Sequence, residues 1–348
     1  MIKVNNAIIG VFVLSVFFLS GCKSSDRLNP DVSKINANVK FIRLEKELFN
    51  IDSLHYTDEM KNLVEKHGDV IEFFITRLHS YGRWNDPNTL TKFRQVYLNN
   101  PYMRDSLYPD VEKVFTDPVI QDIESQFTDA FKHLKYYYPK DSLPKVYTII
   151  NPFGFQSFTY GKDLLIALEF FLGEKYRFYP SLEMPEYKMK DFRKEYILPT
   201  SLKTIFQGKY DEDKLTDQTL LSKMIYQGKR LFYLDIMKPD MADTLKIEYT
   251  TKQLNWCKTY QYDMWEHLVT KNLLYNTNQD KVDRYIAEGP FTNDEDVPQE
   301  SAPRLGEWTG WQIVKKYMEE NPKVTVDELF RDKDYKKILT LSKYKPSK

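Results

Sequence analysis

The first strongly apolar stretch of the chain is short and lies close to its start. Residues 7–19 are almost all apolar, Lys3 precedes them, and Ser20, Gly21 and Cys22 follow. This run is shorter than the roughly 20 apolar residues that a helix needs to cross a bilayer. A basic start, a short apolar run and small residues at its end are typical of a secretory signal. Residues 1–21 are therefore predicted to be a signal peptide.

The position of Cys22 behind this run indicates a lipid anchor. Leu19-Ser20-Gly21-Cys22 is similar to the bacterial lipobox, in which the thiol after two small residues receives diacylglycerol and becomes the mature N-terminus. Burial of two or more acyl chains anchors a protein stably to a membrane. An ordinary signal peptide with an incidental cysteine is the alternative. We expect Cys22 to be lipidated.

Residues 22–38 are predicted to be the lipidated cysteine and a polar tether, because they include Pro30 and show no apolar periodicity. Lys23 follows the cysteine directly, at a place where Asp favours retention in the inner membrane of some bacteria. The sequence therefore favours the outer membrane over the inner membrane, with the protein facing the periplasm.

From residue 39 onward most apolar positions recur at helical spacing. The predicted helices cover 57–82 with a division at Gly68, two stretches that end near Tyr138, and then 190–206, 216–237, 250–274, 281–287 and 304–320. Asp217 and Thr250 are predicted N-caps, and Pro239 is a predicted stop.

Short β-rich runs interrupt these helices. Residues 39–44 alternate apolar and charged side chains, and residues 144–173 contain KVYTIIN, PFGFQSFTYG and KDLLIALEFFLG. Asn151-Pro152 and Gly161-Lys162 separate these three runs and are typical of turns. We expect a small, mainly antiparallel sheet packed against several helices. The predicted class is helix-dominated α+β, with residues 39–348 as a single domain.

Composition and charge narrow the range of partners. The chain of 348 residues has 50 Lys and Arg against 50 Asp and Glu, so no overall field favours nucleic acid. Once Cys22 is modified, Cys257 is the remaining thiol, and no intramolecular disulfide can form. Cys257 lies on a helical pattern and is predicted to be a small buried apolar residue.

A search for catalytic motifs gives no candidate. None of the five histidines lies in an HExxH motif, and His67 and His79 are too far apart on one helix to share a zinc ion. Cys257 and His267 are ten residues apart, which is too far for a catalytic pair on a single helix. Neither a catalytic residue, a metal site nor a cofactor is therefore predicted.

One segment near the C-terminus could be either a recognition patch or a core helix. Its candidate residues are Arg304, Glu307, Trp308 and Trp311. The two tryptophans share a helix face. Gly306 and Gly310, four residues apart, would let another backbone approach closely. Dense packing in the core is the favoured interpretation, and an interaction patch is the alternative.

Several segments resemble a known family. They are DLLIALEFFLGEKYRFYP, KEYILPTSLKTIF, LLSKMIYQGKRLFYLDIMKPD, QLNWCKTYQYDMWEHLVTKNLLYNT and PRLGEWTGWQIVKKYMEENP. Together they closely resemble the GldB gliding-motility lipoproteins of the Bacteroidetes, in order from the lipobox to the C-terminal KYKP. The resemblance implies a lipid-anchored, periplasm-facing component of gliding with no established enzymatic activity.

The resemblance also implies a distant similarity to zincin peptidases. The helix that would carry HExxH corresponds to residues 197–205, which contain no histidine, and the third metal ligand corresponds to Gln227. A neutral amide is a poor ligand for zinc. The resemblance therefore implies a degenerate, non-catalytic scaffold.

The leading hypothesis is a membrane-anchored periplasmic lipoprotein that is required for gliding motility and has no enzymatic activity. Its expected partners are the lipid bilayer, through acylated Cys22, and other gliding or envelope proteins. A metal-dependent peptidase or other hydrolase with an unrecognised site is one alternative. A glycan-binding surface lipoprotein is another, because the 25 tyrosines and 22 phenylalanines could stack on sugars.

Overall fold

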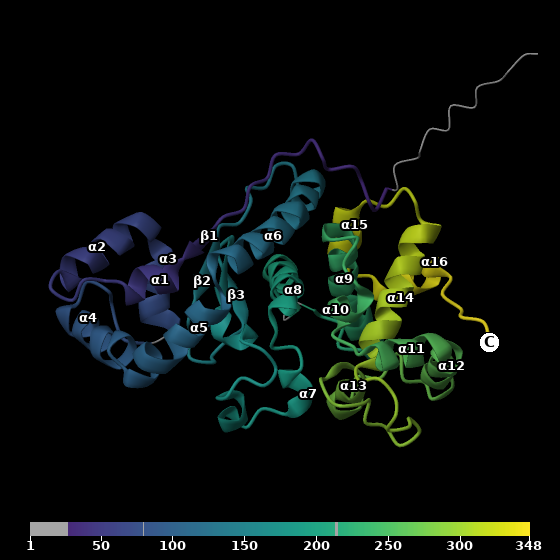
Figure 1. The fold of residues 1–348 in the computed structure, drawn as a ribbon. Coiled ribbons are helices and arrows are strands. Elements are labelled where there is room, and N and C mark those ends of the chain that lie inside the picture. Colours follow the sequence, from purple (N-terminus) through teal and green to yellow (C-terminus); the bar gives the residue numbers. More distant parts are fainter. Residues whose placement is uncertain (1–26, 79, 213–214) are drawn as a thin grey trace, which may run out of the picture.

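A small mixed sheet lies between two groups of helices, as Figure 1 shows. The computed structural model describes residues 27–78, 80–212 and 215–348, so Cys22 and the predicted signal peptide lie outside the described residues. The N-terminal helices cover one side of the sheet. The central and C-terminal helices lie on its other side. The predicted helix-dominated α+β class is confirmed.

The sheet has the strand order β1-β2-β4-β3. The strands are β1 (Phe41–Arg43), β2 (Val146–Ile149), β3 (Ser157–Tyr160) and β4 (Asp163–Ala167). Strand β2 pairs in parallel with both β1 and β4, and only the β3–β4 hairpin is antiparallel. Gly161, with φ of 59°, forms the turn of this hairpin.

The expectation of a mainly antiparallel sheet is therefore wrong. The prediction came from runs that are adjacent in sequence, and adjacency correctly gives the β3–β4 hairpin. Adjacency does not reveal that β1, about a hundred residues upstream, pairs with β2. It also does not reveal that β3 lies at the edge of the sheet while β4, the next strand in the chain, pairs with β2. All of β2 and most of β4 are buried, as is usual for parallel strands covered on both faces.

The N-terminal group of helices packs beside β1 and β2. Its members are α1 (Leu44–Phe49), α2 (Tyr56–His67), α3 (Asp69–Phe73), η1 (Phe74–Leu78), α4 (Pro87–Phe93), η2 (Arg94–Leu98), η3 (Met103–Leu107) and α5 (Tyr108–Val114). Helix α6 (Asp117–Tyr137) follows; its Phe127 ring packs against Phe41 of β1, and the helix contacts α8 and α9. Gly68, with φ of 58°, separates α2 from α3, as the sequence predicts.

The remaining elements form the central and C-terminal part. They are η4 (Leu168–Phe171), η5 (Tyr179–Leu182), α7 (Glu186–Met189), η6 (Lys194–Tyr196), α8 (Ile197–Lys209), α9 (Leu220–Met237), α10 (Asp243–Ile247), α11 (Thr251–Thr259), α12 (Gln261–Thr270), α13 (Gln279–Ile286), α14 (Leu305–Glu320), α15 (Val326–Arg331) and α16 (Tyr335–Ser342). None of the helices described here is long and apolar enough to cross a membrane.

Two predicted helix starts have different outcomes. Thr250 caps α11 in a capping box with Gln253, as expected. Helix α9 begins later than predicted, because its N-cap is Thr219 and not Asp217. The predicted helix 250–274 divides at Tyr260, so Cys257 and His267 lie on different helices. Cys257 is buried as predicted, and burial raises the pKa of its thiol.

Helices α9 and α14 cross with their backbones in contact. A methyl group at Gly228 would overlap the carbonyl group of Gly310, and one at Gly310 would overlap the carbonyl oxygen of Met224. Gly306 likewise leaves space for Met224 and for the end of α13. The close approach that the sequence predicts at Gly306 and Gly310 is confirmed, and Gly228 is its counterpart on α9.

Residues 27–38 lie against the body and are not a free chain. The Arg27 guanidinium donates to the carbonyl oxygens of Met318, Pro322 and Val324 at 2.8, 2.6 and 2.6 Å. Val32 and Ala37 are buried. The described part of the predicted tether, residues 27–38, is therefore a strap that begins at the C-terminal end of α14 and runs to β1, as Figure 1 shows.

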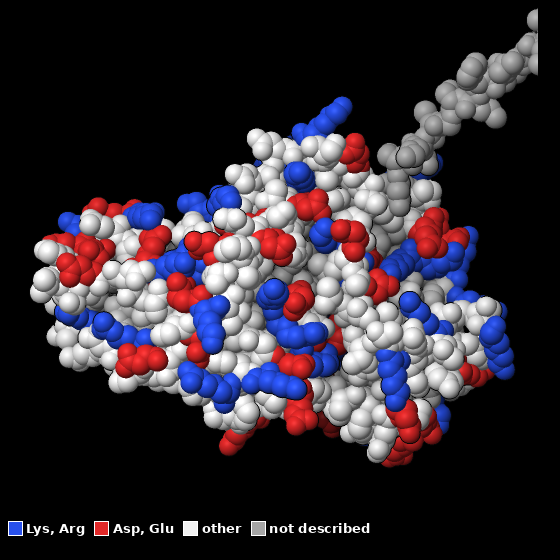
Figure 2. Space-filling view, in the orientation of Figure 1, with Lys and Arg blue, Asp and Glu red and all other residues white. Residues whose placement is uncertain are grey.

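Charged side chains of both signs are interspersed over the face that Figure 2 shows. Lys203, Lys229 and Lys246 are instead buried among the described residues. Lys229 on α9 is 2% exposed, and its ammonium donates to the Asp332 carbonyl oxygen at 2.5 Å. Burial lowers the pKa of Lys229 from its ordinary value of 10.5 to about 7. An amine whose pKa is lowered by folding makes folding less favourable at any pH at which the unfolded chain binds the proton more readily than the folded protein does.

Gly310→Ala is expected to reduce the free energy of unfolding by more than about 4 kcal/mol, because its methyl group meets a backbone atom that cannot move without separating α9 from α14. Urea denaturation followed by circular dichroism measures the loss. Glu319→Ala, at an exposed position of the same helix, is the control and should change stability by less than about 0.5 kcal/mol. Equal stability of the two variants would contradict the close crossing.

Lys229→Met is expected to raise the free energy of unfolding by about 1–3 kcal/mol at pH 7, because it removes a buried amine. In the wild-type protein Lys229 lowers the free energy of unfolding increasingly as the pH falls from 10.5 towards 7, because the unfolded chain binds the lysine proton more readily than the folded protein does. The advantage of the variant should therefore shrink between pH 7 and pH 10. Denaturation at several pH values tests this, with exposed Lys258→Met as the control.

Candidate functional site

The four residues of the predicted interaction patch lie inside the protein. Arg304 is 6% exposed, and Glu307, Trp308 and Trp311 are 1–2% exposed. The Trp311 indole donates to the Asp235 carboxylate at 2.7 Å. These residues do not form an exposed surface, and the arrangement agrees with the favoured interpretation of a tightly packed core helix.

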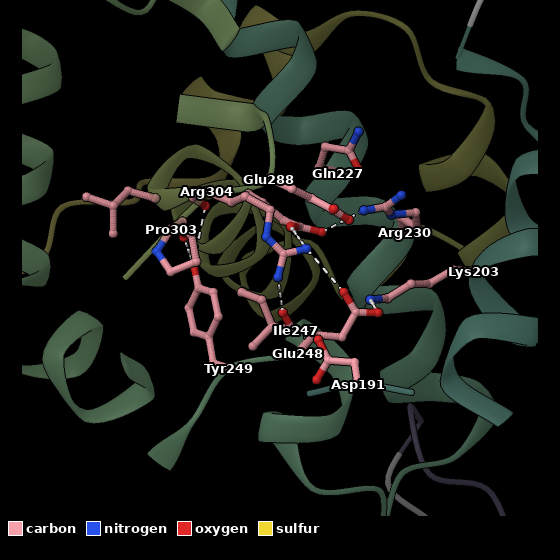
Figure 3. A network of polar contacts seen from close by, with 12 residues as sticks. Asp191, Lys203, Gln227, Arg230, Ile247, Glu248, Tyr249, Glu288, Pro303 and Arg304 are labelled. Atoms are coloured by element: carbon pink, nitrogen blue, oxygen red, sulfur yellow. Dashed lines mark hydrogen bonds and ion pairs between the residues drawn. The ribbon is translucent and has the colours of Figure 1, made fainter. Parts of the chain in front are cut away.

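Arg304 and Glu307 instead belong to a buried charge cluster. Figure 3 labels four of its five members. We define the charge cluster as Lys203 on α8, Arg230 on α9, Glu248 after α10, and Arg304 and Glu307 at the start of α14. Neighbouring members alternate in sign, so the cluster runs from Lys203 through Glu248, Arg304 and Glu307 to Arg230. It joins four segments that are far apart in the sequence.

The distances in the charge cluster are those of hydrogen-bonded ion pairs. The Lys203 ammonium lies 2.7 Å from one oxygen of Glu248, and the Arg304 guanidinium lies 3.2 Å from the other. Arg304 also lies 3.3 Å from Glu307, whose second oxygen accepts from Arg230 at 2.9 Å. Each carboxylate therefore has a separate cation on each oxygen, an arrangement that compensates much of the cost of burial.

The backbone at the centre of the cluster is held in an unusual conformation. Glu248 and Arg304 both adopt the left-handed region, with φ of 59° and 50°. The Arg304 guanidinium donates to the Ile247 carbonyl oxygen at 2.5 Å, and the Tyr249 hydroxyl donates to the Pro303 carbonyl oxygen. These bonds join the turn after α10 to the start of α14. They stabilise a backbone conformation that non-glycine residues rarely adopt.

The pKa shifts follow from burial and mutual attraction. Burial alone would raise the pKa of Glu248, but the charges of Lys203 and Arg304 outweigh it and lower that pKa to about 2. Burial likewise opposes ionisation of Glu307, and the nearby arginines nevertheless lower its pKa. For Lys203, burial outweighs the attraction of Glu248 and lowers the pKa. Both carboxylates therefore stay ionised at neutral pH.

A pocket of about 230 Å³ opens above one side of the cluster. Glu248 and Arg304 lie in its lining, together with Lys190 and Asp191, which pair with each other at 2.6 Å. Lys188 and Glu288 also line the pocket, and a 3.0 Å ion pair joins their side chains. The charged groups of the pocket are thus engaged with each other, which suits a structural role or weak binding of a small polar group.

The comparison with protein-family models shows which family the chain belongs to. The model described as gliding motility protein GldB matches residues 25–346, which is nearly the whole chain. The chain belongs to the GldB family. Neither the curated proteins nor the solved structures gave a match. The family is described as a gliding motility protein, and the family name indicates a lipoprotein. The predicted resemblance to GldB is confirmed.

The distant similarity of this GldB protein to zincin peptidases stays a prediction. Helix α8, which would correspond to the HExxH helix, contributes Lys203 to the charge cluster. Gln227, at the place of the third ligand, donates from its amide to the Glu212 carboxylate at 3.2 and 3.3 Å. Within the described ranges no group of three or more His, Cys, Asp and Glu side chains could hold a metal ion.

The sequence reasoning named two members of the charge cluster and missed the other three. Lys203 lies in TSLKTIF and Arg230 in QGKRLFYL, both next to apolar residues that are buried in their helices. A charged residue at a core-facing position of a predicted helix was the available signal, because such residues are rarely buried without a partner. Glu248 lies in a short connection between helices and gave no comparable signal.

Glu248→Gln is expected to reduce the free energy of unfolding by about 3 kcal/mol at pH 7, because Lys203 and Arg304 lose a buried counter-charge. Its lowered pKa means that the stabilisation by Glu248 is fully present above about pH 4.5 and is lost as the pH falls towards 2. Urea denaturation at pH 7, 4.5 and 3 should show the two proteins converging in acid.

The control for this experiment is Glu288→Gln, at the exposed ion pair in the pocket lining. Its partner Lys188 is 43% exposed, so the pair should contribute less than about 1 kcal/mol. A loss at Glu288 as large as that at Glu248 would show that the charge cluster has no special importance for stability.

Proposed function

We propose that this protein is a lipid-anchored, non-enzymatic component of the gliding machinery. In this proposal acylated Cys22 holds it in the outer membrane, on the periplasmic side, and its body acts through contacts with other gliding or envelope proteins. The observation that carries the proposal is the match to the GldB family over residues 25–346. The lipobox at residues 19–22 supports the anchor.

The geometry of the charge cluster supports a non-enzymatic role. Its two carboxylates are each held between cations, and their lowered pKa values leave them unsuited to act as general acids or bases near neutral pH. The same side chains hold α8, α9 and α14 together. A group that is committed to such contacts cannot approach a substrate without loss of fold stability.

Cys22→Ser is expected to abolish lipid attachment and colony spreading, because the hydroxyl cannot replace the thiol as acceptor of diacylglycerol. Incorporation of labelled palmitate, membrane fractionation and spreading assays measure the three consequences. Cys257→Ala is the matched control, since it removes the buried thiol of the body and should leave palmitate incorporation unchanged. Labelled palmitate on the Cys22→Ser protein would refute the anchor, and normal spreading of a clean deletion strain would refute the role in gliding.

A further inference from the structure

A second cavity differs in character from the pocket above the charge cluster. It is an apolar groove of about 560 Å³ between α11, α12, α13 and the loop before α14. Its apolar lining includes Trp256, Tyr260, Met264, Leu268, Val297 and Leu305. This volume lies in the range of sites that accommodate a small ligand or a few side chains of a peptide.

The walls of the groove are held in place by contacts within the protein. His267 on α12 and the Tyr285 hydroxyl on α13 are hydrogen-bonded at 2.7 Å. The Lys271 ammonium pairs with Asp296 at 2.7 Å and ties the loop to α12. The rings of Trp256 and Tyr260 lie 4.9 Å apart across the junction of α11 and α12. A groove that is already formed costs little ordering when a partner binds.

The charged side chains that line the groove are acidic. They are Asp263, Asp296 and Glu300, while His267 is the one basic side chain in the described lining. Asp296 is engaged by Lys271. Asp263 and Glu300 are exposed, and the carboxylate of neither forms an ion pair or hydrogen bond with the described residues. These two carboxylates therefore give the rim a negative potential next to an apolar interior.

We propose that this groove binds a segment of a partner protein in which an apolar side chain is flanked by Lys or Arg. The apolar side chain would lie against Met264 and Leu268, and the cations would face Asp263 and Glu300. Anionic lipid headgroups would be repelled by the same rim. The inference rests on the proposed function in one respect, since it names the chemistry of the contact through which the protein acts.

Peptide binding tests the proposal directly. The full-length lipidated protein, in phosphatidylcholine nanodiscs, is titrated into a fluorescent peptide with two aromatic residues flanked by lysines, and into the same peptide with glutamates in place of the lysines. Fluorescence anisotropy is expected to show at least tenfold tighter binding of the lysine peptide, after subtraction of binding to empty nanodiscs. Equal binding of the two peptides would overturn the proposal and would indicate a groove for lipid or for any apolar ligand.

Two variants locate the binding to the groove. Asp263→Lys/Glu300→Lys reverses the rim and should weaken the lysine peptide by about tenfold, which corresponds to about 1.4 kcal/mol, and should strengthen the glutamate peptide. Val297→Trp should weaken both peptides, because it adds bulk to the apolar interior. The matched control is Glu72→Lys/Asp105→Lys, the same change of net charge at exposed positions of the N-terminal helices. Thermal denaturation confirms that each variant is folded.

Experiments in cells test the groove proposal independently of the proposed function. A photoreactive amino acid at Tyr260, which is 44% exposed, should capture a peptide with Lys or Arg beside an apolar residue, whereas the same label at Tyr136, which is 47% exposed, should not. The rim reversal should reduce spreading while palmitate incorporation at Cys22 continues. Normal spreading with the reversed rim would overturn the groove proposal, and the outcome of the deletion and Cys22→Ser strains would stand independently.

Discussion

The backbone contact between α9 and α14 is the constraint on which the rest of the structure depends. Gly228 lies two residues before Arg230, and Gly310 lies three residues after Glu307, so the crossing point places these two charges opposite each other. Glu307 then fixes Arg304, which reaches Glu248, and Glu248 binds Lys203 on α8. Because α8 packs on β3 and β4, one steric contact determines how the C-terminal helices meet the sheet.

The charge cluster adds specificity to this arrangement more than net stability. Buried ion pairs repay their desolvation only in part, and apolar residues of similar volume often stabilise a core as well. A sliding or rotation of α14 would separate Arg230 from Glu307 and Arg304 from Glu248. The loss of a buried counter-charge costs several kcal/mol. The glycines permit many close crossings in principle, and the charges select one of them. The small glycines therefore allow α9 and α14 to approach closely, and the buried charges determine at which position they cross.

The sequence predicted the local features of the fold much better than its long-range pairings. The helix periods, the division at Gly68, the Thr250 cap and the close approach at Gly310 all depend on residues within one or two turns of each other. The parallel pairing of β2 depends on β1, about a hundred residues upstream, and on β4, which follows only after the edge strand β3. The charge cluster likewise depends on ion pairs between four segments. No local pattern encodes these partners, although Lys203 and Arg230 were detectable as charges at core-facing positions.

The strap and the groove lie at opposite ends of α14, and this determines which end of a lipid-anchored protein would face the membrane. Arg27 binds carbonyl oxygens at and beyond the C-terminal end of α14, whereas Leu305 at its N-terminal end lines the groove. The 16 residues of α14 span about 24 Å. Only four residues lie between Cys22 and Arg27, and the five steps from one Cα to the next can span at most about 18 Å. Under the proposed anchoring, the strap end of the body therefore lies close to the lipid surface, and the groove lies on the end that is free to meet a partner.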